Sequence, residues 1–208
     1  MTADPHWNHN VHYHPVVLAA VPDGCRTALD VGCGDGLLAR KLAARAETVT
    51  GVDRSVEMIR LARETASGNA TFLEADYLGE TALKGGTALK EGGYDFVSAV
   101  AVVHHTRFED AVARLTALLA PGGRLVIVGL ARDRTVLDLM ISVCALLPNR
   151  LRGLLRGGEG GLVDVPVEDP AMPWGEVRRA ALRLLPGCRY RRRLLWRYTV
   201  VWDKPPVR

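Results

Sequence analysis

Short apolar runs alternate with segments of helical periodicity from residue 27 onward. Strand-like runs span 27–33, 48–53, 70–76, 94–100 and 123–130. Helical patterns lie between them, at 37–46, 55–66, 108–120 and, more loosely, 78–90. Strands that alternate with helices in this way indicate parallel strands with helices on both faces, which is a doubly wound α/β sheet.

The alternation changes near the end of the chain. A helical segment over 174–187 is followed by "CRYRRRLLWRYTVVWDKP", which holds two strand-like runs with only a few residues between them. A connection this short allows only an antiparallel pair. We therefore expect a seven-stranded, mostly parallel sheet that ends in a hairpin with one reversed strand.

Two segments stand outside the sheet pattern. Residues 1–23 precede the first strand and are expected to form an N-terminal cap, and 131–173 form a long excursion after the fifth strand. Ligands of open α/β sheets bind at the carboxyl ends of the strands, where this excursion starts, so we expect it to act as a lid. The whole chain is expected to be one domain, with 24–130 as its ligand-binding core and 174–208 as the last helix and hairpin.

Composition is that of a single globular domain. The 208 residues are 48% hydrophobic and 24% charged, and the formal net charge is +4. The excess of arginine lies in the C-terminal third and is expected to be a solvated face, which argues against a nucleic-acid partner. The four cysteines have no metal-ligand spacing, and no apolar run resembles a signal peptide or reaches the roughly 20 residues of a membrane span. We expect a cytoplasmic monomer or homodimer with reduced thiols.

A glycine-rich stretch, "ALDVGCGDG" at 28–36, follows the first strand-like run. Gly32, Gly34 and Gly36 stand at alternate positions, and such a turn lets a ligand approach the backbone closely. The spacing is GxGxG, which departs from the dinucleotide fingerprint GxGxxG. Asp30, just ahead of the loop, would repel a pyrophosphate but can accept a hydrogen bond from an ammonium group.

Two further acids end the next two strand-like runs. Asp53 can hold both hydroxyls of a ribose, and Asp76 can accept a hydrogen bond from the exocyclic amine of adenine. Together with Asp30, these acids predict a ligand that carries an amino group, a ribose and a base, and that needs no phosphate.

With these motifs the chain resembles the class I S-adenosylmethionine-dependent methyltransferases, the group that includes the ubiquinone and menaquinone methyltransferases and many small-molecule enzymes of actinobacteria. The matching motifs are, in order, "LDVGCGDG", "GVDRS", "EADY", "YDFVSAVAVVHH" and "LLAPGGRLVIVGL". The resemblance implies a Rossmann-like fold, S-adenosyl-L-methionine as cofactor and S-adenosyl-L-homocysteine as product.

The same resemblance implies which residues surround the cofactor. They are Asp30, Gly32, Cys33, Gly34, Gly36, Asp53, Arg54, Met58, Ala75, Asp76, Tyr77 and Val100. Cys33 is expected to be a small packing residue whose backbone borders the ligand. Arg54 or Met58 is expected to cover the adenine, with a place in the core as the alternative for Met58.

Histidines are the candidate proton acceptors. Methyl transfer chiefly needs alignment, and a general base is required only where the acceptor holds its proton at neutral pH. His104 and His105 follow the fourth strand, and Tyr13 and His14 lie in the N-terminal segment. We expect His104 or His105 to take the proton, assisted by Tyr13 or His14. A hydrogen-bonded scaffold role for the doubled histidine is the alternative.

The N-terminal histidines also allow a metal site to be considered. His6, His9 and His12 recur every three residues, which would align them on a helix. Asp4 is the only nearby acid, and no cysteine completes a ligand set. We therefore expect no metal.

The methyl acceptor is expected to be a hydrophobic small molecule, aromatic compounds included. One side of 137–155 is apolar, and Trp196 and Tyr198 can supply aromatic walls, although these residues can also be core. No "DPPY" or "NPPY" follows the fourth strand, and no Pro-Cys pair supplies a nucleophile, which argues against DNA amino-adenine and pyrimidine-carbon methylation. An RNA or protein methyltransferase, favoured by the basic C-terminal third, and a non-catalytic S-adenosylmethionine-binding module stay open.

Overall fold

The computed structural model describes residues 10–66, 68–79, 89–133, 172–193 and 196–207. Within these ranges, no helix combines the length and hydropathy that a bilayer span requires. Most of the expected helix at 78–90 and of the expected lid at 131–173 lies outside the described residues, as do His6 and His9.

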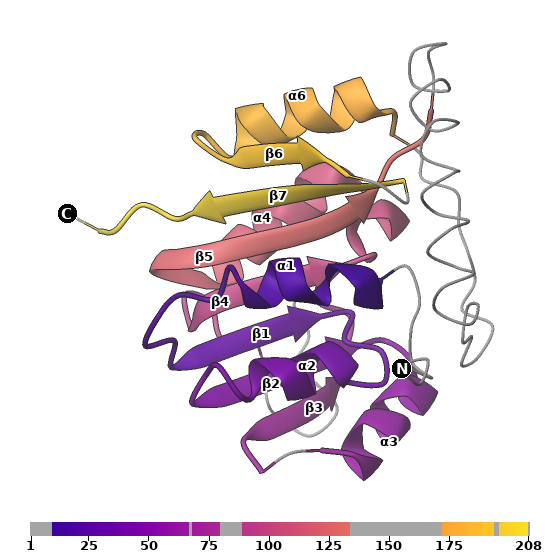
Figure 1. Cartoon of the computed structure of the whole chain (residues 1–208), viewed down its shortest axis with the longest axis vertical. Coiled ribbons are helices and arrows are strands. Elements are labelled where there is room, and N and C mark those ends of the chain that lie inside the picture. Colours follow the sequence, from indigo (N-terminus) through magenta and orange to yellow (C-terminus); the bar gives the residue numbers. More distant parts are fainter. Residues whose placement is uncertain (1–9, 67, 80–88, 134–171, 194–195, 208) are drawn as a thin grey trace, which may run out of the picture.

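Seven strands form one sheet in the order β3-β2-β1-β4-β5-β7-β6 (Figure 1). The strands are β1 Thr27–Val31, β2 Thr48–Asp53, β3 Ala70–Glu74, β4 Tyr94–Val100, β5 Leu119–Leu130, β6 Arg189–Arg192 and β7 Arg197–Asp203. The first five pair in parallel, and β7 lies antiparallel between β5 and β6. The predicted mostly parallel sheet with a reversed strand near its end is confirmed.

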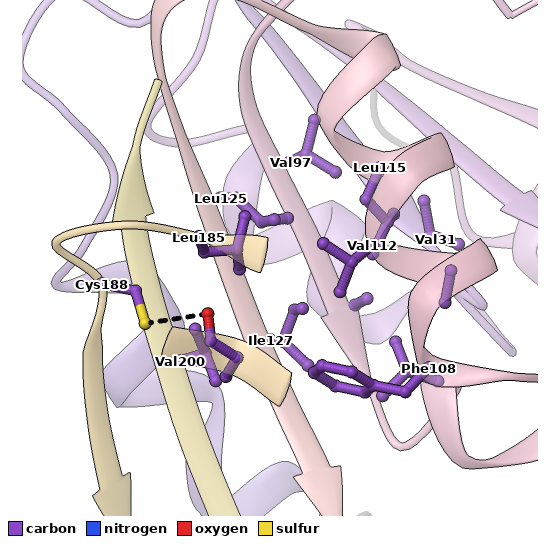
Figure 2. Close-up of a cluster of buried hydrophobic side chains, with 14 of the residues drawn as sticks. Val31, Val97, Phe108, Val112, Leu115, Leu125, Ile127, Leu185, Cys188 and Val200 are labelled. Atoms are coloured by element: carbon purple, nitrogen blue, oxygen red, sulfur yellow. Dashed lines mark hydrogen bonds between the residues drawn. The ribbon is translucent and has the colours of Figure 1, made fainter. Parts of the chain in front are cut away.

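Helices cover both faces of the sheet (Figure 1). They are α1 His14–Leu18, α2 Leu37–Leu42, α3 Val56–Glu64, α4 Phe108–Leu118 and α6 Trp174–Leu184, with short 3-10 helices η1 Val11–Tyr13 and η2 Val103–His105. Because successive side chains of a strand point to opposite faces, Leu125 and Ile127 of β5 pack in the core under α4 and α6. Val126 and Val128 pack in the core under α1, α2 and α3. Figure 2 shows the first core, where Phe108 of α4 lies beside Ile127.

The strand β5 begins earlier than its apolar run predicts. The chain leaves α4 ahead of Pro121, and the Pro-Gly-Gly stretch belongs to the strand. Gly122 N donates to Lys204 O at 3.0 Å, and Lys204 N donates to Gly123 O at 2.8 Å. These bonds extend the pairing of β5 with β7 beyond the last residue of β7. Gly122 adopts φ 76° there, a left-handed conformation that favours glycine.

The order of the strands reverses between β1 and β4. In open α/β sheets, ligands bind at the carboxyl ends of the strands beside such a reversal. The glycine loop after β1, Asp53 at the end of β2 and η2 after β4 all lie at this edge. The topology therefore places these three segments at one edge of the sheet.

The segments that flank the core are tied to the same edge. Asn10 Oδ1 accepts a hydrogen bond of 2.9 Å from Arg197 Nη2, which joins the N-terminal segment to the start of β7. Trp174 Nε1 donates to Asp133 Oδ1 at 2.9 Å, and the Arg192 guanidinium lies 4.0 Å from the centroid of the Trp174 ring. The chain after β5 is thereby fixed to the start of α6 and to β6.

Candidate active site

The glycine loop joins β1 to α2, and its three glycines have different roles. Gly32, Gly34 and Gly36 all have positive φ, at 67°, 53° and 78°. A β-carbon at Gly32 would overlap Val102, and one at Gly36 would lie 2.6 Å from the Phe72 ring. Gly34 has no atom within 4 Å of the corresponding point. The outer two glycines are therefore needed for packing, whereas Gly34 leaves the backbone open to an approaching ligand.

Asp53 connects the end of β2 to the glycine loop. Its Oδ2 accepts a hydrogen bond of 3.0 Å from Gly34 N, and its Oδ1 accepts one of 2.9 Å from Ser55 N. Each carboxylate oxygen has two lone pairs, so each can accept a second hydrogen bond from a ligand hydroxyl. The carboxylate both orders the loop and remains half-buried beside it.

Asp30 lies beneath the loop as a buried carboxyl group, with 2% of its surface exposed. Ser98 Oγ donates to its Oδ1 at 2.8 Å, and its buried Oδ2 has no hydrogen-bond partner among the described residues. Burial raises the pKa of Asp30 to about 7, while the Ser98 bond lowers it and the charge of Asp53 raises it further. An ammonium group of a ligand is the chemistry that would satisfy this oxygen.

Cys33 is buried inside the loop and is not a reactive thiol. Its amide donates to Val52 O at 3.0 Å. Burial raises the pKa of the thiol far above its usual range, and the charges of Asp30 and Asp53 add to the effect. The thiol packs in the core under α1, α2 and α3, and its Sγ donates a weak hydrogen bond of 3.7 Å to Gly34 O.

The residues expected around the adenine follow β2 and β3. Arg54 is exposed, and Met58 is half-buried in the first turn of α3. Ala75 N donates to Asp53 O at 2.9 Å, which ties the chain after β3 to the end of β2. Asp76 is exposed, and its Oδ1 accepts from Leu78 N at 3.0 Å. Because β3 ends at residue 74, Asp76 lies in a turn rather than closing the strand as expected.

Tyr77 is placed differently from its neighbours in sequence. Its ring is buried in the core beneath α4, and its hydroxyl lies 3.4 Å from Thr106 Oγ1. Burial raises the pKa of Tyr77. Only its backbone is therefore left as a candidate to face a ligand. Val100, at the end of β4, packs against the opposite core.

The doubled histidine lies on η2, after β4. The ring centroids of His104 and His105 are 4.0 Å apart, and the rings are tilted by 37°. Ala101 just before them has φ 55°, which is uncommon for a residue other than glycine and indicates local backbone strain. Strain of this kind is frequent at functional sites.

The N-terminal candidates lie on η1 and α1. Tyr13 and His14 are both buried, with 3% and 6% of their surfaces exposed. Lys41 Nζ lies 3.3 Å from His14 Nδ1, so this nitrogen acts as an acceptor toward the ammonium of α2. Burial lowers the pKa of His14 to about 4, and the charge of Lys41 lowers it further. His14 is therefore neutral near pH 7 and a weak base.

Three contributors to the site were missed by the sequence reasoning. Ser98 lies opposite Asp30 in the register of β1 and β4, and a polar residue inside an apolar strand could have signalled it. Val102 packs on the glycine loop, and Ala101 carries the strained backbone. Neither of these two has a sequence signal. The sequence allows Tyr198 either as an acceptor wall or as a core residue, and it lies in the core with its ring stacked on Tyr190.

No group of three or more His, Cys, Asp or Glu side chains is arranged to hold a metal ion in the described parts of the chain.

Several known proteins are similar to this chain. Residues 29–127 match a family model described as a methyltransferase domain. An uncharacterized methyltransferase of Mycobacterium bovis is 36% identical over 212 residues, which covers 97% of this chain and 99% of the relative. The ubiquinone biosynthesis O-methyltransferase of Escherichia coli is 35% identical over 99 residues, 47% of this chain and 40% of its own. A solved structure of SAM-dependent methyltransferases from Methanosarcina mazei has the same fold, with a TM-score of 0.61 at 17% identity over 93% of this chain and 98% of its own.

Proposed function

The chain belongs to the class I S-adenosylmethionine-dependent methyltransferases, and from this premise we propose that it methylates O, N or C of a hydrophobic small molecule, with aromatic and quinone-like compounds as first candidates. The cofactor is S-adenosyl-L-methionine. The similarity to the Escherichia coli ubiquinone biosynthesis O-methyltransferase supports an acceptor of this kind. A role in secondary or quinone-like metabolism follows from the same proposal.

The single observation that carries the cofactor assignment is the buried Asp30 Oδ2. Its lack of a hydrogen-bond partner among the described residues fits an ammonium group, and the open space at Gly34 fits a ligand that lies against the loop backbone. We assign the ribose hydroxyls to Asp53 and the adenine amine to Asp76. When bound, the cofactor supplies a methyl group on a sulfonium, which is transferred by in-line displacement.

The protein's part in that reaction is alignment, exclusion of water and, where the acceptor is protonated, removal of a proton. We propose His104 or His105 for the proton, because both follow the strand whose carboxyl end meets the glycine loop. Tyr13 is proposed as a polar assistant. His14 is the weaker candidate for this assistance, since its Nδ1 faces Lys41 and its pKa lies at about 4.

The test is to incubate the protein with methyl-labelled cofactor and cell extract separated into small-molecule, RNA and protein fractions. Label in one hydrophobic metabolite, identified by mass, is the expected result. Label in the RNA or protein fraction would replace the small-molecule acceptor. Cofactor binding without labelling of any fraction would indicate a binding module instead of an enzyme.

A further inference from the structure

Four exposed arginines gather on the outer rim of the sheet. Arg178 and Arg179 are exposed on α6, and Arg189 and Arg191 are exposed on β6, the outermost strand. No ion pair or side-chain hydrogen bond engages them among the described residues. Several other arginines pair with carboxylates, among them Arg26, Arg60, Arg114, Arg124, Arg183 and Arg192. We call these four residues the basic edge.

Two arginines of the basic edge belong to the strand β6, and the other two belong to the helix α6. Arg189 and Arg191 are opposite Val201 and Thr199 in the register of β6 and β7, so both lie on the sheet face away from α6. Arg192, the next residue of β6, points to the opposite face of the sheet, and its Nη2 donates a hydrogen bond of 3.3 Å to Asp133 Oδ1. In Figure 1, α6 lies along β6 at the rim of the molecule.

Exposed apolar side chains accompany these charges. Leu182 is 41% exposed and lies three and four residues after the two arginines of α6, on the same helix face. Trp196 is 37% exposed in the connection from β6 to β7, with φ 54°. Basic residues mixed with an exposed aliphatic residue and an exposed indole are typical of surfaces that lie on lipid headgroups.

We propose that the basic edge docks this protein on an anionic membrane surface, with the arginines at the lipid phosphates and Leu182 and Trp196 at the headgroup boundary. Charge complementarity supports this partner, since the four guanidinium groups have no carboxylate of the described chain to neutralise them. A nucleic-acid backbone would also attract the charges, but it offers no apolar layer for Leu182. The docking does not depend on the identity of the methyl acceptor.

The test measures co-sedimentation of the full chain with vesicles of phosphatidylcholine, with and without phosphatidylglycerol. We expect binding only to the anionic vesicles, with loss at high salt. Each arginine at an anionic surface contributes about fivefold to partitioning, so the double variant Arg189→Gln, Arg191→Gln should bind about 30-fold more weakly. Leu182→Ser should weaken binding at unchanged net charge.

The matched control is the double variant Arg26→Gln, Arg60→Gln, which lowers the net charge by the same two units on other parts of the surface. It should bind vesicles as the parent chain does. Equal losses in both double variants would reduce the effect to net charge and overturn the proposal. Absence of vesicle binding would also overturn it, and the arginines would then serve only to hinder pairing of the edge strand β6 with another chain. Salt-dependent binding to single-stranded RNA, without binding to vesicles, would overturn it as well.

Discussion

Ser98 Oγ donates a hydrogen bond of 2.8 Å to Asp30 Oδ1, across the pairing of β4 with β1. The bond holds one oxygen of the carboxyl group, and the other oxygen is buried without a hydrogen-bond partner among the described residues. Burial nevertheless raises the pKa of Asp30 to about 7. Asp30 is therefore mostly protonated at about pH 6 and mostly ionised at about pH 8.

Cofactor affinity should rise with pH between about 6 and 7.5, because only the ionised carboxylate can pair with an ammonium group. Asp30→Asn should bind the cofactor at least about tenfold more weakly at about pH 7.5 and lose this pH dependence. Titration calorimetry at several pH values measures both effects. An Asn variant with the same slope as the parent chain would assign the pH dependence to another group.

The same pKa shift makes the stability of the cofactor-free protein depend on pH. An Asp in the unfolded chain titrates near pH ~3.9, so the folded state binds more protons between about pH 4 and 7. The stabilising contribution is complete below about pH 4 and is lost as the pH rises through about 7. Asp30→Asn should therefore show a higher Tm than the parent chain at about pH 8 without cofactor. Scanning calorimetry that finds a lower Tm there would contradict the buried charge.

Gly34 and Gly24 form a matched pair for testing the ligand's approach to the loop. Both have positive φ, at 53° and 69°, and a β-carbon at either would meet no atom within 4 Å. An alanine should cost each about 1 kcal/mol of stability through strain. Only Gly34→Ala should weaken cofactor binding, because Gly24 precedes β1 at the opposite end of the strand. Calorimetric affinities that fall equally in both variants would remove Gly34 from the site.

His14 should contribute to acid sensitivity. Burial lowers its pKa to about 4, whereas an unfolded His titrates near ~6.5, so the folded state binds fewer protons in between. Its stabilising contribution is present above about pH 6.5 and is lost as the pH falls toward about 4. His14→Gln keeps an acceptor for Lys41 and cannot titrate. Urea unfolding at about pH 7 and pH 4.5 should show a smaller acid loss for this variant than for the parent chain, and an equal loss would assign the acid sensitivity elsewhere.

The order of the helices and strands and the glycine-rich character of the loop after β1 could be predicted from the sequence, because both depend on local signals. Alternating apolar runs predicted the doubly wound sheet, and the short gap before Arg197 predicted the reversed strand β7. Gly34 was expected at a position of close backbone approach, and its open surroundings are consistent with that role.

Contacts between distant segments could not be predicted in the same way. Gly32 excludes a side chain because Val102 packs against it, and no pattern near either residue encodes that contact. Tyr77 was predicted within the adenine motif "EADY", yet burial of its ring beneath α4 outweighs a place at the surface. His14 is neutral near pH 7 because burial lowers its pKa and the charge of Lys41 on another helix lowers it further. Its chemistry therefore depends on packing that the N-terminal segment alone does not specify.

The chemical role of the doubled histidine can be tested once the acceptor is known. His104 and His105 lie on η2 with ring centroids 4.0 Å apart, and both follow the strand whose carboxyl end meets the glycine loop. Alanine in place of the responsible histidine should lower kcat by about 10²-fold while the Kd of the cofactor stays unchanged. Added imidazole should restore part of that loss, which a purely structural role would not allow. Alanine at the other histidine should mainly lower Tm, because a packed ring loses its hydrogen bonds. Near-normal turnover in both single variants and in the double variant, with an unchanged pH profile, would mean that alignment alone drives the transfer and that both histidines are scaffold.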